Sequence, residues 1–146
     1  MGRAMTEDAQ TGPIGIVIVA HGALADALLG AVEHVMGRQP SVRTISIDAD
    51  YDKAAKGAEI RAAAEAVDGG GGVVVVVDLH GSSPANLCQA VSGAGRRHIL
   101  TGANLPMLLK LAQSRHLPLD QAAAAAVLAG RKYIDGRDLG PERDGR

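Results

Sequence analysis

Aromatic side chains are almost absent from this chain of 146 residues, which has two tyrosines and neither tryptophan nor phenylalanine. A core must therefore be built from valine, isoleucine, leucine and alanine, and the 47% of hydrophobic residues is sufficient for one. The same scarcity argues against readers of single-stranded nucleic acid, which stack bases on aromatic rings. With a formal net charge of -1, the chain also lacks the positive field that attracts a phosphate backbone, so we expect no nucleic-acid binding.

Cysteine and long hydrophobic runs are equally scarce. Cys88 is the single cysteine, so the chain forms neither an intrachain disulfide nor a thiolate cage around a metal, which fits a reducing compartment. No apolar run approaches the ~20 residues of a membrane helix. Residues 1–12 lack the apolar stretch of a signal peptide. We therefore expect a cytoplasmic protein without direct membrane insertion.

Length and patterning predict one domain of alternating strands and helices. We expect a disordered lead-in over 1–12, a folded domain over 13–134 and a polar tail over 135–146. Strands are predicted at 15–20, 41–47, 73–78 and 97–101. Helices are predicted at 23–36, 51–67, 84–91, from Pro106 to about 114, and at 120–134.

The strands at 15–20 and 73–78 contain continuous runs of β-branched residues, a pattern typical of strands that are buried on both faces. Because such strands alternate with helices here, we expect an α/β fold with a doubly wound, mainly parallel sheet and helices on both faces. Ligands of such sheets bind beyond the carboxyl ends of the strands, where the strand order reverses. The candidate functional loops are therefore 21–22, 78–84 and 102–106.

His21 is the main candidate for chemistry, because it directly follows the first buried strand and precedes a helix. The first N–H groups of a helix are unpaired and carry partial positive charge. A phosphoryl group on the imidazole would therefore find hydrogen-bond donors in Gly22 and its neighbours. The alternative is a histidine that only packs at the start of a loop, and the sequence alone leaves both interpretations open.

Asp78 follows a run of five valines, where a carboxylate is costly to bury unless another group pairs with it. An imidazole N–H of His21 is a suitable partner, which would fix the ring tautomer and leave the other nitrogen free to attack phosphorus. Alternatively, Asp78 caps a backbone turn. Ser82 and Ser83 are candidate phosphate-binding hydroxyls, although Ser83 also fits as the N-cap of a helix that begins at Pro84.

His80 introduces a competing hypothesis, because His21, Asp78 and His80 resemble a metal triad by residue type. Their spacing matches no established metal signature, so we expect neither a metal nor a cofactor. Cys88 has the apolar neighbours Leu87 and Val91 and is interpreted as a small core residue rather than a nucleophile.

Four segments of the sequence occur together in a characteristic order. They are IGIVIVAHG at 14–22, EHVMG at 33–37, VDLHGSSPAN at 77–86 and GANLPML at 102–108. Together they resemble the mannose-type IIA component of the bacterial phosphoenolpyruvate-dependent sugar phosphotransferase system. The resemblance extends over about residues 14–134 and includes motifs at all three candidate loops.

The resemblance implies a phosphocarrier in which His21 accepts phosphate from the phosphohistidine of a small histidine phosphocarrier protein and passes it on. The aspartate that orients the imidazole in this family corresponds to Asp78, and its serine or threonine before the proline corresponds to Ser83. Ser82 stands where the family commonly has a second glycine, and His80 where it usually has an apolar or aromatic residue. The resemblance also implies an α/β sandwich fold and a homodimer.

The sequence does not identify the protein that accepts the phosphate from His21. Because a dozen polar residues follow Ile134, we expect onward transfer to a separate IIB component, or use of the phosphate in regulating sugar or nitrogen metabolism. One alternative is the phosphoryl donor subunit of a dihydroxyacetone kinase, with the same fold and a histidine at the same turn, although the match at 102–108 favours the sugar system. Others are a non-catalytic regulatory binding module and a chelatase-like metal binder that uses His21 and His80.

Overall fold

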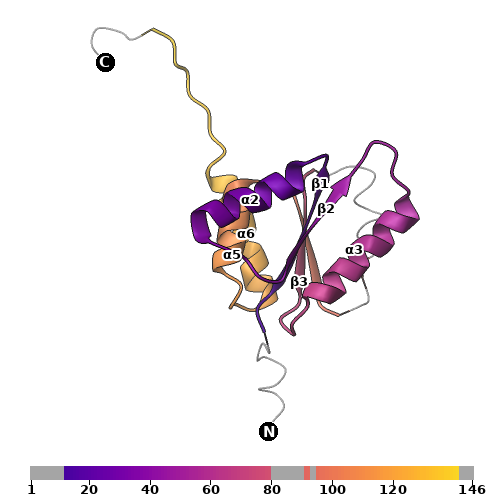
Figure 1. The fold of residues 1–146 in the computed structure, drawn as a ribbon. Helices are drawn as coiled ribbons and strands as arrows, with labels where there is room; N and C mark the ends of the chain where they lie inside the picture. The colour runs from indigo at the N-terminus through magenta and orange to yellow at the C-terminus, as the bar shows by residue number, and fades with distance from the viewer. Residues whose placement is uncertain (1–11, 80–90, 93–94, 142–146) are drawn as a thin grey trace.

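The computed structural model describes residues 12–79, 91–92 and 95–141. Within these ranges the chain forms a four-stranded sheet with the strand order β2-β1-β3-β4 (Figure 1). Every neighbouring pair of strands is parallel. The strands are β1 (Gly15–His21), β2 (Val42–Ile47), β3 (Val73–Val77) and β4 (Arg97–Thr101). The predicted doubly wound parallel α/β fold is confirmed.

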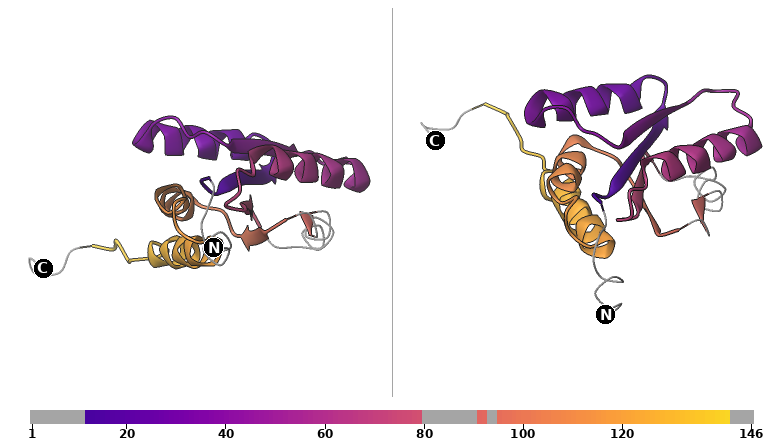
Figure 2. Two further views of the ribbon diagram at one scale, coloured as in Figure 1. Left: turned by 90° about the horizontal axis from the view of Figure 1, so that it is seen from below. Right: turned by 60° about the horizontal axis from the view of Figure 1, so that its bottom comes forward.

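Helices cover both faces of the sheet, as the two views in Figure 2 show. One face packs against α2 (Leu24–Met36), α5 (Leu105–Gln113) and α6 (Leu119–Lys132). The other face packs against α3 (Lys53–Val67). Alternate residues of the central strand β1 enter the two cores, which is why its sequence is a continuous apolar run rather than an alternating one.

Element ends differ from the sequence predictions by one or two residues. α3 begins at Lys53 rather than 51, because the Asp52 side chain accepts hydrogen bonds from the N–H groups of Ala54 and Ala55 at 2.9 and 3.2 Å. α5 begins before Pro106, because the Asn104 side chain caps it and a proline in the first turn needs no N–H.

Some predicted segments lie outside the described residues. They are the lead-in before Gly12 and the helix predicted at 84–91, apart from its last residue, Val91, which is buried against the α3 face. Cys88 also lies outside. After α6 the chain has no helix or strand up to 141, and its side chains there are exposed. None of the helices in the described ranges is long and apolar enough to cross a membrane.

The strand order reverses between β1 and β3. From β1 the chain continues outward to β2, and it then returns to place β3 on the opposite side of β1. Such a switch point opens a crevice at the carboxyl ends of the two strands. Since Val19 pairs with Val77, the residues that follow them on β1 and after β3 come together there.

Candidate functional site

His21 and Asp78 meet at the carboxyl ends of β1 and β3. One oxygen of Asp78, Oδ2, accepts hydrogen bonds from the backbone N–H of His21 at 2.9 Å and from its ring Nδ1 at 2.8 Å. The Asp78 side chain is 8% exposed, whereas that of His21 is 59% exposed. The carboxylate thus binds the exposed imidazole at Nδ1. It makes no contact with the other ring nitrogen, Nε2.

The charge of Asp78 is maintained by its contacts with His21. Burial alone raises the pKa of this carboxyl, but the backbone N–H and the ring of His21 outweigh burial and hold the pKa below its ordinary value. Its second oxygen, Oδ1, is buried and accepts no hydrogen bond from a residue that the structure describes. An ionised Asp78 favours the tautomer with the proton on Nδ1 and stabilises positive charge on the ring.

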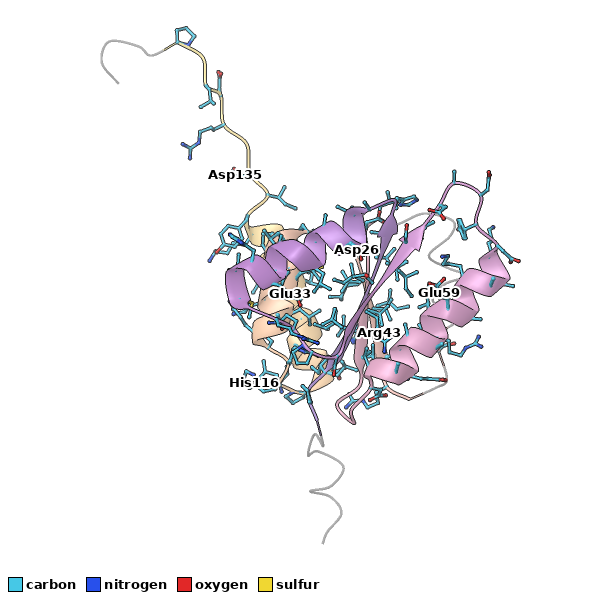
Figure 3. The ribbon with its side chains drawn as sticks, viewed as in Figure 1. Asp26, Glu33, Arg43, Glu59, His116 and Asp135 are labelled. Carbon is cyan, nitrogen blue, oxygen red and sulfur yellow. The ribbon has the colours of Figure 1, made fainter. Side chains whose placement is uncertain are left out.

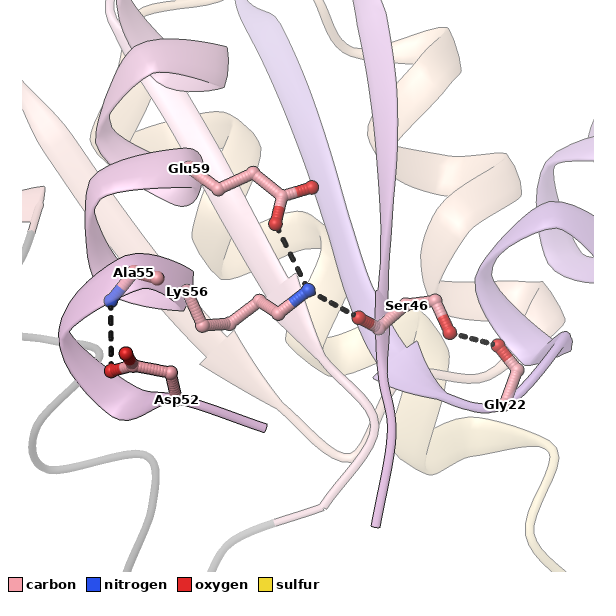
Figure 4. Close-up of polar contacts among 6 residues, drawn as sticks. All are labelled: Gly22, Ser46, Asp52, Ala55, Lys56 and Glu59. Carbon is pink, nitrogen blue, oxygen red and sulfur yellow. Dashed lines mark hydrogen bonds and ion pairs between the residues drawn. The ribbon is translucent and has the colours of Figure 1, made fainter. Parts of the chain in front are cut away.

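The turn that follows His21 is held by the neighbouring strand β2. The N–H of Gly22 donates to the carbonyl of Ile47 at 3.1 Å. The carbonyl of Gly22 accepts from the Ser46 hydroxyl at 2.7 Å, as Figure 4 shows. Gly22 has a φ of 57°, in the left-handed region. A Cβ at this position would meet no described atom within 4 Å, so the turn requires glycine for its conformation and not for space.

Helix α2 begins directly after this turn without a side-chain cap. Ala23 is its N-cap residue and makes no side-chain hydrogen bond, in contrast to Asp52 of α3 and Asn104 of α5. The acidic residue in the first turn of the helix, Asp26, accepts a hydrogen bond from the Thr44 hydroxyl on β2. The first N–H groups of α2 therefore lie near His21 without a capping oxygen from the described residues, an arrangement that suits an anion.

The structure brings together three of the predicted site residues, His21, Gly22 and Asp78. Ser82, Ser83 and the competing metal ligand His80 lie outside the described residues. In the ranges that are described, no three His, Cys, Asp or Glu side chains are arranged to hold a metal ion.

Among the described residues, His116 and the groove between α5 and α6 lie away from this site. Figure 3 shows His116 at the opposite end of the sheet from Asp26, which lies near the carboxyl end of β1. A groove of about 540 Å³ lies between α5 and α6, and its lining contains neither His21 nor Asp78. The contact between His21 and Asp78 at the switch point is therefore separate from this groove.

Ser46 and Lys56 contact the turn after His21 or its support, although no pattern in the sequence indicates a role for either residue. The carbonyl of Ser46 accepts a hydrogen bond from Lys56 Nζ at 2.9 Å, and the same ammonium pairs with Glu59 at 2.9 Å. In the sequence, Ser46 is simply a polar position of a weakly alternating strand, and Lys56 is one charge on a solvated helix face. The register of β2 against β1 would have been the signal, because it places Ser46 opposite Ala20 and Ile47 opposite His21.

The fold places this chain among the doubly wound parallel α/β domains, which bind their ligands at the carboxyl ends of the strands beside a switch point. The family profile described as "PTS system fructose IIA component" matches residues 15–128. The chain belongs to this family of phosphotransferase-system IIA components, and the resemblance drawn from its sequence is confirmed.

Individual relatives agree with this assignment. The chain is 30% identical over 125 residues to the "PTS system mannose-specific EIIAB component" of Escherichia coli strain K12, covering 83% of this chain and 38% of that protein. It therefore spans well under half the length of this curated relative. The solved structure of phosphotransferase system component EIIA from Streptococcus agalactiae is 27% identical, with a TM-score of 0.70 over 84% of this chain and 96% of that one.

A more distant structure supports the fold alone. The mannose/sorbose specific IIA subunit from Enterococcus faecalis is 23% identical and superposes with a TM-score of 0.75. The superposition covers 90% of this chain and 99% of that one.

Proposed function

We propose that this chain is a phosphocarrier that accepts a phosphoryl group on Nε2 of His21 from the phosphohistidine of a small carrier protein. The observation that carries the proposal is the double hydrogen bond from His21 to Asp78 Oδ2, because it engages Nδ1 and leaves Nε2 to react. The family to which the chain belongs supports the same chemistry. Transfer on to a second protein reverses the acceptance step.

The proposed step forms one bond and breaks one. The lone pair of His21 Nε2 attacks phosphorus while the P–N bond to the donor imidazole breaks, and the donor nitrogen keeps that electron pair. The proton on Nδ1 stays in place, and the positive charge that develops on the ring is stabilised by Asp78. The carboxylate acts before the step as well, because it sets the ring tautomer and orientation.

The phosphoryl oxygens need donors as they arrive. The uncapped N–H groups at the start of α2 supply them on one side, in the manner of other phosphate sites at helix N-termini. We propose Ser82 and Ser83 as further donors; the family resemblance implies this role for Ser83, and Ser82 is proposed for its hydroxyl alone. No metal or cofactor is part of this scheme.

The proposed partners follow from the direction of transfer. The donor is a histidine phosphocarrier protein, and the acceptor is a separate IIB component or a regulatory target, with all steps in the cytoplasm. We also propose a homodimer, because a core with almost no aromatic volume makes a small monomer marginal. Light scattering at micromolar concentration should give twice the mass of the chain, and a monomeric mass would count against the dimer.

Mass spectrometry tests the central step. After incubation with phosphoenolpyruvate, the general phosphotransferase enzyme and the carrier protein, we expect one acid-labile phosphoryl group on His21. The His21→Ala variant should fold normally and take up none, because the side chain is exposed. His116→Ala is the matched control, since His116 is also exposed and lies at the other end of the sheet. Uptake by His21→Ala, or none by the wild type, would refute the proposal.

A further inference from the structure

The turn after His21 is held by a side chain that no motif of the sequence singles out. We infer that Ser46, on β2, is a positioning residue for phosphoryl acceptance at His21. The inference rests on the proposed phosphocarrier function. It is carried by the hydrogen bond of 2.7 Å from the Ser46 hydroxyl to the Gly22 carbonyl.

Strand β2 fixes Gly22 at both of its backbone polar groups. The N–H of Gly22 donates to the Ile47 carbonyl at 3.1 Å, while its carbonyl accepts from Ser46. The parallel pairing of β1 with β2 therefore continues one residue beyond the strand, with a hydroxyl in place of the next backbone donor. Glycine is the residue with the most backbone freedom, so an external restraint on it has the greatest effect on the turn.

The restraint sets the direction of the next N–H group. In a trans peptide the C=O and the N–H point to opposite sides, and the described residues contain no cis peptide. Because the Gly22 carbonyl points toward β2, the N–H of Ala23 points away from β2. This is the side of β1 on which β3 lies and on which Asp78 holds the ring of His21. Ser46 thus aims a backbone donor of the α2 start toward the side where the phosphoryl group would sit.

Ser46 is itself anchored from the other face of the sheet. Lys56 of α3 donates to the Ser46 carbonyl and is paired with Glu59, and its side chain is 16% exposed. Figure 4 shows the continuous series of contacts from Glu59 through Lys56 and Ser46 to Gly22. The hydroxyl therefore extends from a fixed backbone, which lets it hold the turn in one geometry.

The test is the single-turnover rate of phosphorylation of the full chain by the phosphorylated carrier protein. Ser46→Ala should lower the rate at saturating carrier roughly tenfold, the effect of losing one well-formed hydrogen bond in the transition state. The carrier concentration at half-maximal rate and the melting temperature should stay unchanged, because Ser46 is exposed and small. Ser46→Thr keeps the hydroxyl and should restore most of the rate. Thr101→Ala, which removes an exposed hydroxyl at the end of β4, should match the wild type.

Each outcome separates this inference from the proposed function. A wild-type chain that accepts no phosphate overturns the function and the positioning role with it. A wild-type chain that accepts phosphate while Ser46→Ala does so at the same rate overturns the role of Ser46 alone. Equal losses in Ser46→Ala and Ser46→Thr also overturn it, since the hydroxyl would then not be the group that matters. Lys56→Met offers a second variant, in which a smaller loss with an unchanged half-maximal carrier concentration is expected.

Discussion

A single carboxylate oxygen of Asp78 accepts two hydrogen bonds from His21, one from the backbone N–H and one from the ring. The same atom therefore fixes both the end of β1 and the orientation of the imidazole. Because the register of β1 against β3 sets the position of Asp78, the geometry of the ring depends directly on the pairing of the two central strands.

Replacing Asp78 by asparagine tests the charge of this oxygen. Asparagine keeps the shape of the side chain but loses the negative charge that stabilises positive charge on the ring. We expect single-turnover transfer to slow by about 10²-fold, with the fold retained. Asp138→Asn, in the exposed segment after α6, is the control and should leave the rate unchanged. A wild-type rate for Asp78→Asn would remove the carboxylate from the mechanism.

Two glycine substitutions, which we expect to change the free energy of unfolding in opposite directions, test the conformation of the turn. Gly22→Ala places a Cβ at a φ of 57° and should lower the free energy of unfolding by about 1–2 kcal/mol. Gly30→Ala is the matched control, because Gly30 lies inside α2 with nothing described within 4 Å of a new Cβ. It should raise the free energy of unfolding by up to about 1 kcal/mol. Urea unfolding measures both, and a neutral Gly22→Ala would contradict the requirement for glycine.

The ion pair between Asp68 and Arg97 predicts a loss of stability in acid. Their atoms lie 2.7 Å apart, with the Arg97 side chain 6% exposed and that of Asp68 23% exposed. Burial alone raises the pKa of Asp68, but the N–H of Gly70 and the Arg97 guanidinium hold it below its ordinary value. A lowered pKa in the folded state stabilises the fold above the unfolded pKa of about 4, and this contribution disappears as the pH falls through the folded value.

Asp68→Asn should therefore destabilise the protein by about 2 kcal/mol at pH 7, since it leaves a buried guanidinium without its anion. The difference from wild type should shrink as the pH falls below about 4, because the unfolded chain then binds a proton at Asp68 before the folded chain does. Urea unfolding at pH 7 and at about pH 3 is the measurement, with Asp138→Asn as the control. If the difference in the free energy of unfolding between wild type and Asp68→Asn were the same at both pH values, the packing of Asp68 rather than its charge would account for its contribution to stability.

Metal removal separates the phosphocarrier from the metal-binding alternative. If backbone N–H groups receive the phosphate, a chelator should not change transfer between the purified carrier and this chain once the upstream magnesium-dependent enzyme is removed. His80→Leu, which brings the sequence closer to the family pattern, should lower transfer by a modest factor. Stoichiometric zinc that is lost together with activity in His80→Leu would favour the metal site instead.

The central strands and the contact between His21 and Asp78 could be predicted from the sequence because their signals are local. Runs of β-branched residues mark β1 and β3, and His21 and Asp78 stand directly at the ends of those runs. Parallel alternation with helices then brings the two ends to one edge without further information.

Contacts that depend on register or on distant segments could not be predicted in this way. The role of Ser46 follows from its place opposite Ala20, which no spacing in the sequence reveals. Arg115 is 7% exposed and donates through Nε to the carbonyl of Ile14 at 2.7 Å and through a terminal nitrogen to that of Ser41 at 3.2 Å. In the sequence, a buried arginine of this kind cannot be distinguished from a surface charge, because its partners precede two strands that are distant from it along the chain.

Because β1 lies between β2 and β3, the stability of the site against unfolding depends on the stability of the whole domain. Amide groups of a strand that is paired on both sides and buried in two cores exchange with solvent only when the domain opens globally. The exposed imidazole of His21 is therefore attached to the end of a strand that we expect to unfold last. We therefore expect local fraying of the termini to leave the pair with Asp78 intact, and the pair and the native fold to be lost at the same denaturant concentration.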